Sequence, residues 1–309
     1  MSSNAHVPVL LGPVLKGLDI KQDGVYVDAT FGRGGHSSAI LQQLNADGRL
    51  IAIDRDPQAI ASATPALRND PRLILIRSDF AELAKHITEK GLAGSVDGLL
   101  LDLGVSSPQL DEAARGFSFL RDGPLDMRMD PDSGVSAAEW VNNANEKTLK
   151  RVLYQFGEER DAPRIARAIV NARQNARIET TGELAAVVSS VVPAHTRKKH
   201  PATKTFQAIR IVINEELEQL QTVLTESVDL LAQGGRLCVI SFHSLEDRIV
   251  KRFMRDASRE TEQYRGMPDV PAEFRPKLRQ VGKAITASNE EIAANVRARS
   301  ARLRIAERT

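Results

Sequence analysis

The run VYVDATFGRGGH at residues 25–36 constrains the fold of this chain more than any other stretch. Its first four residues alternate β-forming side chains and stop at Asp28, which is typical of a short buried strand. Glycines follow at positions 32, 34 and 35, and a backbone without Cβ atoms can take positive φ and let a ligand lie against the main chain. A helix beginning near Ser37 would turn its free N–H groups toward the same place. We therefore predict a binding turn between a strand and a helix.

A second strand, predicted at residues 50–54, ends in Asp54, about 20 residues after Gly34. An acid at this offset usually accepts hydrogen bonds from the ribose hydroxyls of a nucleoside-containing ligand. The third position of the glycine fingerprint is Ser37 instead of glycine. A tight turn that binds nothing is therefore the alternative interpretation.

Strand-like segments recur along the first third of the chain, with helical or turn-rich sequence between them. This alternation predicts a parallel sheet with right-handed crossovers, which binds ligands at the carboxyl ends of its strands. Asp28, Asp54 and Asp102 stand at the ends of the first, second and fourth of these strands, and Asp79 follows the third; any one of them alone could instead cap the next helix. The predicted strands are 25–28, 50–54, 73–77 and 98–103.

The alternation stops after Asp102, and the next buried strand is predicted only at residues 236–242. A crossover between parallel strands needs about 30 residues, so this much longer connection contains an inserted domain. Sequences of the capping-box type begin at Ser136 and Thr180 and indicate that the insertion is helical.

A single helix is predicted from Thr203 to just before Gly234, because apolar residues recur at spacings of three and four. This helix would return the chain to the sheet. The predicted domains are therefore a main domain of residues 1–108 and 201–309 and a small helical insertion of residues 109–200.

The composition is that of an ordinary soluble protein, with 42% hydrophobic and 27% charged residues among 309. A net charge of only +2 means that contacts to nucleic acid must come from local patches. The one cysteine, Cys238, cannot form an internal disulfide. The sequence shows no signal-peptide pattern and no apolar run of membrane length, so we expect a cytoplasmic protein. We expect no metal site. The sequence leaves both a monomer and a homodimer open.

Seven motifs give the sequence a specific resemblance, which extends over nearly the whole chain. They resemble those of the ribosomal RNA small subunit methyltransferase H family. The motifs are DATFGRGGH (28–36), AIDRDP (52–57), LDLGVSSPQ (101–109), RGFSF (115–119), GPLDMRMD (123–130), HPAT (200–203) and SFHSLED (241–247).

This resemblance implies a class I, Rossmann-like methyltransferase sheet with a helical insertion that recognises the substrate. It also implies transfer of a methyl group from S-adenosylmethionine to the exocyclic N4 of a cytosine in 16S rRNA, near the ribosomal P site in the small subunit. By the same resemblance, Gly34, Gly35 and His36 contact the methionine and ribose side of the cofactor. The other implied cofactor residues are Asp54 at the ribose hydroxyls, Phe80 against the adenine, and Asp102 and Gln109 beside the methyl-donating end.

Methylation of cytosine N4 requires an acceptor that localises the delocalised amine lone pair, together with a route for the departing proton. Asp102 is the candidate catalytic acceptor, although the familiar Asp/Asn-Pro-Pro-aromatic motif is absent and Asp102 could instead be a cofactor ligand or a loop cap. His36 and His243 can titrate near neutral pH but are left unassigned as bases. Methylation at C5 needs a cysteine nucleophile, and Cys238 lies in mid-strand, where a thiol is normally buried.

For RNA, the sequence offers a basic run at residues 197–199, extended by Lys204 and Arg210. Additional basic residues near the C-terminus could enlarge it, and Phe117, Phe119 or Trp140 could stack on a base, although core packing is the simpler interpretation of each aromatic residue. Two other functions stay open: an NAD-dependent oxidoreductase, because strand, glycine turn, helix and acid also suit dinucleotides, and a non-catalytic ribosome-assembly factor.

Overall fold

The computed structural model describes residues 8–192, 200–260, 264, 271 and 274–309, and the chain forms two compact units. The first unit consists of residues 1–104 and 218–309, and the second of residues 105–217. The predicted insertion at 109–200 lies inside the second unit, which extends further at both ends. In the part of the chain that the structure describes, no helix is both long and apolar enough to cross a bilayer.

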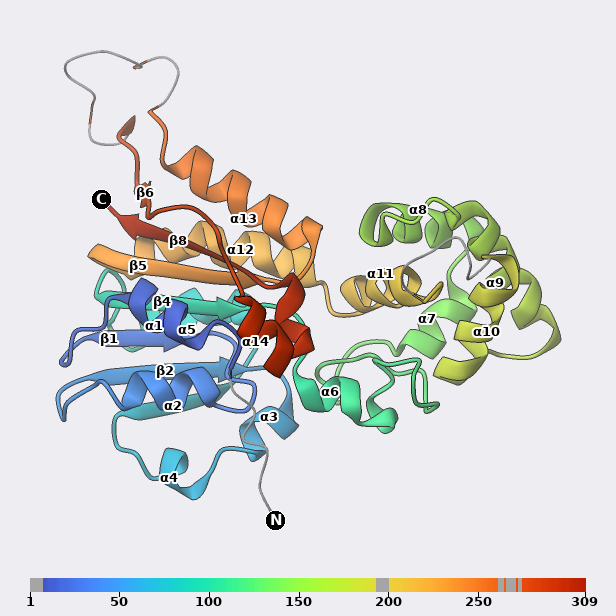
Figure 1. Cartoon of the computed structure of the whole chain (residues 1–309), viewed down its shortest axis with the longest axis horizontal. Helices are drawn as coiled ribbons and strands as arrows, with labels where there is room; N and C mark the ends of the chain where they lie inside the picture. Colours follow the sequence, from blue (N-terminus) through green and yellow to red (C-terminus); the bar gives the residue numbers. More distant parts are fainter. Residues whose placement is uncertain (1–7, 193–199, 261–263, 265–270, 272–273) are drawn as a thin grey trace. The chain divides into compact units, whose positions relative to one another are not determined.

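The first unit is built on one sheet, seen in Figure 1, with the strand order β3-β2-β1-β4-β5-β8-β6. The short strand β7 pairs with β8. Strands β1 to β5 are parallel, whereas β8 runs antiparallel to β5, β6 and β7. The sequence pattern identified all five parallel strands. The strands are β1 (Val25–Asp28), β2 (Arg49–Asp54), β3 (Leu73–Arg77), β4 (Val96–Asp102), β5 (Leu231–Ser241), β6 (Leu278–Gln280), β7 (Ile285–Thr286) and β8 (Arg302–Arg308).

Helices bury both faces of this sheet, because successive side chains of a strand point to opposite sides. Along β4, Leu99 and Leu101 join one apolar cluster, and Leu100 joins the other. The first cluster contains α5 (Leu83–Glu89), α12 (Glu216–Leu230) and α13 (Ser244–Ala257), and the second contains α1 (Leu11–Leu18) and α2 (Gly35–Leu41). Shorter helices of this unit are α3 (Pro57–Ala61), α4 (Pro65–Arg68) and α14 (Asn289–Ala294).

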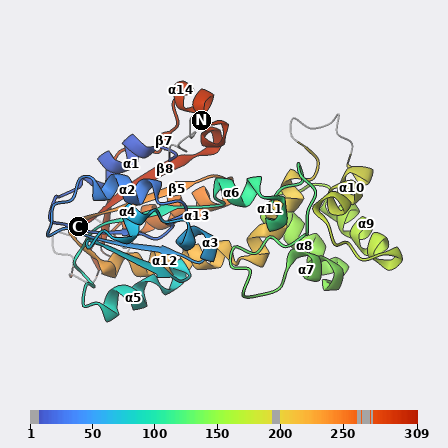
Figure 2. The ribbon, with the colours of Figure 1, turned by 90° about the horizontal axis from the view of Figure 1, so that it is seen from below.

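The second unit, drawn mostly in green to yellow in Figure 2, is helical. It has an apolar core of its own. Both predicted caps are confirmed: the hydroxyl of Ser136 accepts the N–H of Glu139 at 3.1 Å, and Thr180 and Glu183 form a reciprocal capping box. The helices are α6 (Ser107–Asp111), α7 (Ala137–Asn143), α8 (Glu146–Gly157), α9 (Ala162–Asn175), α10 (Thr181–Val191) and α11 (Thr203–Ile213).

The prediction of a single helix from Thr203 to Gly234 is wrong. The helix is broken between α11 and α12, where Glu215 has a φ of 52°. The buried amide of Asn214 donates to the carbonyl of Met127 at 2.8 Å and accepts the N–H of Met129 at 2.8 Å, so it bonds a loop instead of continuing the helix. The apolar spacing gives no sign of this break, because Asn214 and Glu215 lie between two apolar positions of the stripe, Ile213 and Leu217.

Candidate active site

The predicted binding turn joins β1 to α2. Gly32 and Gly34 have φ values of 56° and 73°, and α2 begins at Gly35. A Cβ at Gly32 would meet only the carbonyl of Thr30, at 3.8 Å, so the main chain is open to a ligand there. At Gly34 and Gly35 the corresponding space is filled by the chain itself: a Cβ at Gly34 would lie 2.8 Å from Leu67 Cδ1, and one at Gly35 would overlap Pro8 Cγ. These two glycines are therefore required for packing.

Two of the strand-end carboxylates fix the shape of this turn. Asp28 is buried and accepts the hydroxyl of Ser37 at 2.7 Å, which ties the end of β1 to the first turn of α2. Asp54, at the end of β2, accepts the N–H of Gly32 at 2.7 Å and that of Asp56 at 2.9 Å. Burial raises the pKa of Asp54 to about 6, although both backbone hydrogen bonds oppose the shift. The glycine turn and the acid that the sequence analysis associates, Gly32 and Asp54, are thus in direct contact.

Asp102, the last residue of β4, belongs to the same edge of the sheet. Its N–H donates to the hydroxyl of Thr30 at 2.7 Å, and its Oδ2 lies 3.5 Å from Nδ1 of His36. Its other oxygen, Oδ1, is buried without a hydrogen-bond partner among the described residues. Burial raises the pKa of Asp102 to about 6; His36 opposes the shift, and the charges of Asp28 and Glu246 add to it. A buried carboxylate oxygen without a donor is a candidate for binding a donor on a ligand.

His36 is held in one orientation between Asp102 and the N-terminal segment. Its ring is buried, and Nε2 lies 3.1 Å from the carbonyl of Val9. Because a carbonyl only accepts hydrogen bonds, Nε2 carries the hydrogen, and Nδ1 faces the Asp102 carboxylate. His36 and Asp102 therefore form an ordered acid–imidazole pair.

Glu246 and Thr30 are members of this edge that the sequence reasoning missed. The N-cap of α13 is His243, and Glu246 accepts the N–H groups of Phe242 at 2.8 Å and His243 at 3.2 Å. A glutamate three residues after the N-cap is the sequence signal of a capping box and could have identified Glu246. The signal is weak here because histidine is not a usual N-cap residue. Glu246 is buried and is close enough to raise the pKa of Asp102.

The two other predicted cofactor residues lie in different units. Phe80 begins a short 3₁₀ helix (Phe80–Glu82) after β3 and packs half-buried against the core of the first unit. Gln109 lies in α6 of the second unit, where its side-chain oxygen accepts the N–H of Ser106 at 2.8 Å. The contact of Phe80 with the adenine stays a prediction, as does the contact of Gln109 with the cofactor.

Several described residues of the basic patch predicted for RNA are paired within the chain, and contact of this patch with RNA stays a prediction. Lys204 donates to the carbonyl of Glu158 at 2.7 Å, and Arg210 forms a bidentate pair with Glu216 at 2.7 and 2.8 Å. The basic run at 197–199 lies outside the described residues. The C-terminal Arg302 and Arg304 pair with Asp247.

The candidate stacking aromatics pack inside the second unit. Phe119 stacks on His200 with ring centroids 4.4 Å apart and meets the edge of Phe206. Phe117 is buried, and Trp140 packs half-buried against the same core. Core packing is therefore their observed role.

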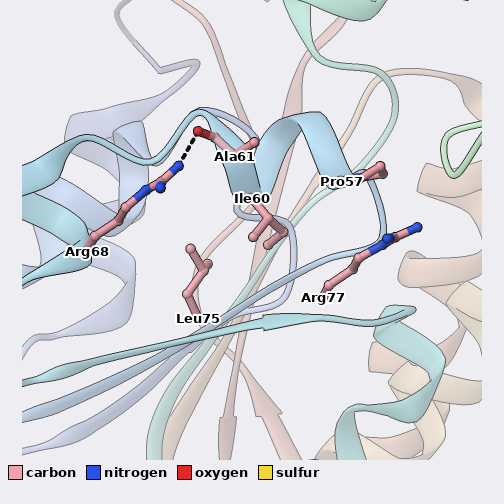
Figure 3. A pocket seen from close by; sticks show the side chains of 6 residues that line it. All are labelled: Pro57, Ile60, Ala61, Arg68, Leu75 and Arg77. Atoms are coloured by element: carbon pink, nitrogen blue, oxygen red, sulfur yellow. Dashed lines mark hydrogen bonds between the residues drawn. The ribbon is translucent and has the colours of Figure 1, made fainter.

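A hollow of about 460 Å³ lies beside the edge strand β3 (Figure 3). Ile60 and Leu75 form its apolar floor, and Arg68 at its rim donates to the carbonyl of Ala61. The remaining lining residues are Pro57, Ala61 and Arg77, so none of the predicted cofactor residues lines this hollow.

The fold and this edge of the sheet together define a class. A parallel sheet of order β3-β2-β1-β4-β5 with an antiparallel β8, a glycine turn after β1 and an acid ending β2 are the parts of a class I S-adenosylmethionine-dependent methyltransferase. The chain belongs to the MraW methylase family, whose sequence model matches residues 3–309. It is accordingly an S-adenosylmethionine-dependent methyltransferase of a family that acts on ribosomal RNA.

Solved structures of other methyltransferases resemble the chain. A protein from Clostridium thermocellum, provisionally assigned as an rRNA methylase, is 14% identical with a TM-score of 0.46, and the match covers 98% of this chain and all of that one. An rRNA methylase from Streptococcus thermophilus is 11% identical with a TM-score of 0.41, covering 97% and 92% of the two chains. A SAM-dependent methyltransferase from Aquifex aeolicus is 9% identical with a TM-score of 0.42, covering 97% and 90%.

Proposed function

We propose that the protein methylates the exocyclic N4 of a cytosine in 16S rRNA, near the P site of the small ribosomal subunit. The observation that carries this proposal is Asp102: a carboxylate at the end of β4, with one buried oxygen that has no donor among the described residues. An amino group is a donor of the kind that such an oxygen lacks. The motifs shared with the N4-methyltransferase family support the choice of cytosine.

The cofactor site that we propose follows the same edge of the sheet. When bound, S-adenosylmethionine would supply an electrophilic methyl group, whose bond to sulfur breaks on transfer and leaves S-adenosylhomocysteine. The open main chain at Gly32 and the backbone of Gly34, Gly35 and His36 would lie along the methionine and ribose. Asp54 would accept the ribose hydroxyls with the carboxylate lone pairs that Gly32 and Asp56 leave free. The remaining assignments are Phe80 against the adenine and Asp102 with Gln109 beside the methyl-donating end.

The amine of cytosine is a poor nucleophile because its lone pair is delocalised into the ring. In our proposal Asp102 Oδ1 accepts a hydrogen bond from N4, which orients the amine and favours localisation of the lone pair as the new N–C bond forms. The proton that leaves N4 passes to the pair of Asp102 and His36. Their 3.5 Å approach and the pKa of about 6 at Asp102 suit exchange of a proton near neutral pH.

The test is transfer of a labelled methyl group to purified 30S particles and, separately, to naked 16S rRNA, with the modified base mapped by mass spectrometry. We expect the label on N4 of one cytosine. Asp102→Asn should abolish transfer while retaining S-adenosylmethionine binding in calorimetry. Label on another atom or base contradicts the proposal, and absence of transfer to either substrate indicates a non-catalytic assembly factor. Binding of NAD in place of S-adenosylmethionine would overturn the cofactor assignment.

A further inference from the structure

Helix α8 has an exposed face that is basic and contains an aromatic side chain. Lys147 lies three and four residues before Lys150 and Arg151, and Tyr154 lies four and three residues after them, so the four side chains share one side of the helix. All four are exposed, and Tyr154 is 66% exposed, which is unusual for a large aromatic residue. We call these four residues the α8 basic face.

The α8 basic face has no partner inside the described part of the chain. None of its four side chains takes part in a hydrogen bond or ion pair there. The nearest acid in the sequence, Glu146, is paired with Arg167 of α9 at 3.8 Å. Three adjacent cations without a carboxylate partner repel one another, so a polyanion would be favoured at this surface.

The helix beneath this face is firmly held. Its opposite side buries Leu149, Val152 and Leu153 in the core of the second unit, where α8 packs against α9 and α11 (Figure 1). Its C-terminal end is fastened to α11 by hydrogen bonds from Lys204 to the carbonyl of Glu158 and from Gln207 to that of Phe156. The basic side chains therefore project from a rigid support.

We propose that the α8 basic face binds the RNA substrate, with its three cations on backbone phosphates and Tyr154 stacked on an unpaired base. Cations supply the affinity of protein for nucleic acid, and an aromatic ring gives each exposed base a surface on which to stack. The identity of the polyanion as ribosomal RNA rests on the proposed function. RNA is favoured over an anionic membrane because a membrane-binding helix inserts its apolar side, and the apolar side of α8 is buried.

The first test measures RNA affinity of the full chain against salt concentration, using 16S rRNA fragments and fluorescence anisotropy. The triple variant Lys147→Gln, Lys150→Gln, Arg151→Gln should bind roughly tenfold or more weakly, and the slope of log Kd against log salt should fall by about 2 to 3. The matched control is Lys16→Gln, Lys90→Gln, Lys283→Gln, which removes equal charge from exposed lysines of the first unit. The control should stay within about twofold of the parent, since its lysines lie outside the α8 basic face.

The second test separates stacking from charge. Tyr154→Ala should weaken RNA binding roughly tenfold, whereas Tyr154→Phe, which keeps the ring, should bind like the parent. Circular dichroism and S-adenosylmethionine calorimetry check that each variant is folded. RNA binding is read without turnover, so failure of methyl transfer leaves this test intact. Equal losses in the triple variant and its control, no RNA binding by the parent, or binding of the α8 basic face to phosphatidylserine vesicles instead of RNA would overturn the proposal.

Discussion

The carboxylate of Asp54 accepts a hydrogen bond from the backbone N–H of Gly32 at 2.7 Å. This contact joins the acid that ends β2 to the one glycine of the turn whose main chain is open. It sets the turn in position before any ligand arrives, which reduces the conformational cost of binding. The carboxylate and the open main chain are thus presented together.

We expect Asp54→Ala to weaken binding of S-adenosylmethionine at least tenfold, because two ribose hydroxyls lose a charged acceptor. RNA affinity should hardly change. Calorimetry with the cofactor and anisotropy with RNA measure the two effects. Asp47→Ala, which removes an exposed acid of the same unit, is the control. Equal losses of both affinities in Asp54→Ala would show that the residue is structural.

Cofactor affinity should also rise with pH. The pKa of Asp54 is about 6 because of burial, so the group is mostly protonated at pH 5 and mostly a carboxylate at pH 7. Only the carboxylate has all its lone pairs available to ribose hydroxyls, so affinity should increase by up to about tenfold per pH unit below 6 and level off above it. Calorimetry from pH 5 to pH 8 tests this. Asp54→Asn should flatten the profile; an unchanged profile in that variant would assign the titration elsewhere.

Much of this edge of the sheet could be predicted from the sequence because its determinants are local. A strand ends where the apolar alternation stops, and a glycine turn requires glycines, so Asp28, Asp54 and Asp102 were placed at their strand ends correctly. The contact between Asp54 and the turn follows once two neighbouring parallel strands are in register.

The features that sequence reasoning missed depend on partners far away in the chain. The break at Asn214 is stabilised by a loop 85 residues earlier in the sequence. Arg302 and Arg304, which belong to the C-terminal basic residues considered for RNA contact, both pair with Asp247 on another element. No local pattern announces such pairings, because each side chain has an ordinary spacing in its own segment.

Gly34 should be much less tolerant of alanine than Gly94. Both have left-handed backbones, with φ of 73° and 74°, so both substitutions cost about 1 kcal/mol in strain. A Cβ at Gly34 would also lie 2.8 Å from Leu67 and Phe31, whereas Gly94 has nothing within 4 Å. We expect Gly34→Ala to lower the free energy of unfolding by a further 1–3 kcal/mol or so. Urea titrations measure both; equal losses would mean that the side chains around Gly34 move aside.

Asp102→Asn should stabilise the protein at pH 8. Burial raises the folded-state pKa of Asp102 from its ordinary value of 3.8 to about 6, so the folded state binds the proton more tightly than the unfolded chain. The contribution of Asp102 to stability therefore falls as pH rises through 4 to 6 and is least favourable above pH 6. Asparagine carries no charge to bury, and the gain should be about 1–3 kcal/mol at pH 8. In urea titrations the gain should shrink toward pH 4, because Asp102 is then protonated in the folded state and buries no charge. Asp54 titrates alike in both proteins and does not change the difference between them. A gain independent of pH would exclude this cause.

Cys238 should be chemically inert in the folded protein, and its removal should not stop methyl transfer. It is the single cysteine of the chain and lies buried in β5, where burial raises its pKa to about 12. At neutral pH almost none of it is thiolate, the form that attacks an electrophile such as a pyrimidine ring. A disulfide reagent should label it only after unfolding in urea, and Cys238→Ala should keep its activity at a modest cost in stability. Rapid labelling of the native protein, or loss of transfer in a folded Cys238→Ala variant, would revive methylation at cytosine C5, the route that requires a cysteine nucleophile.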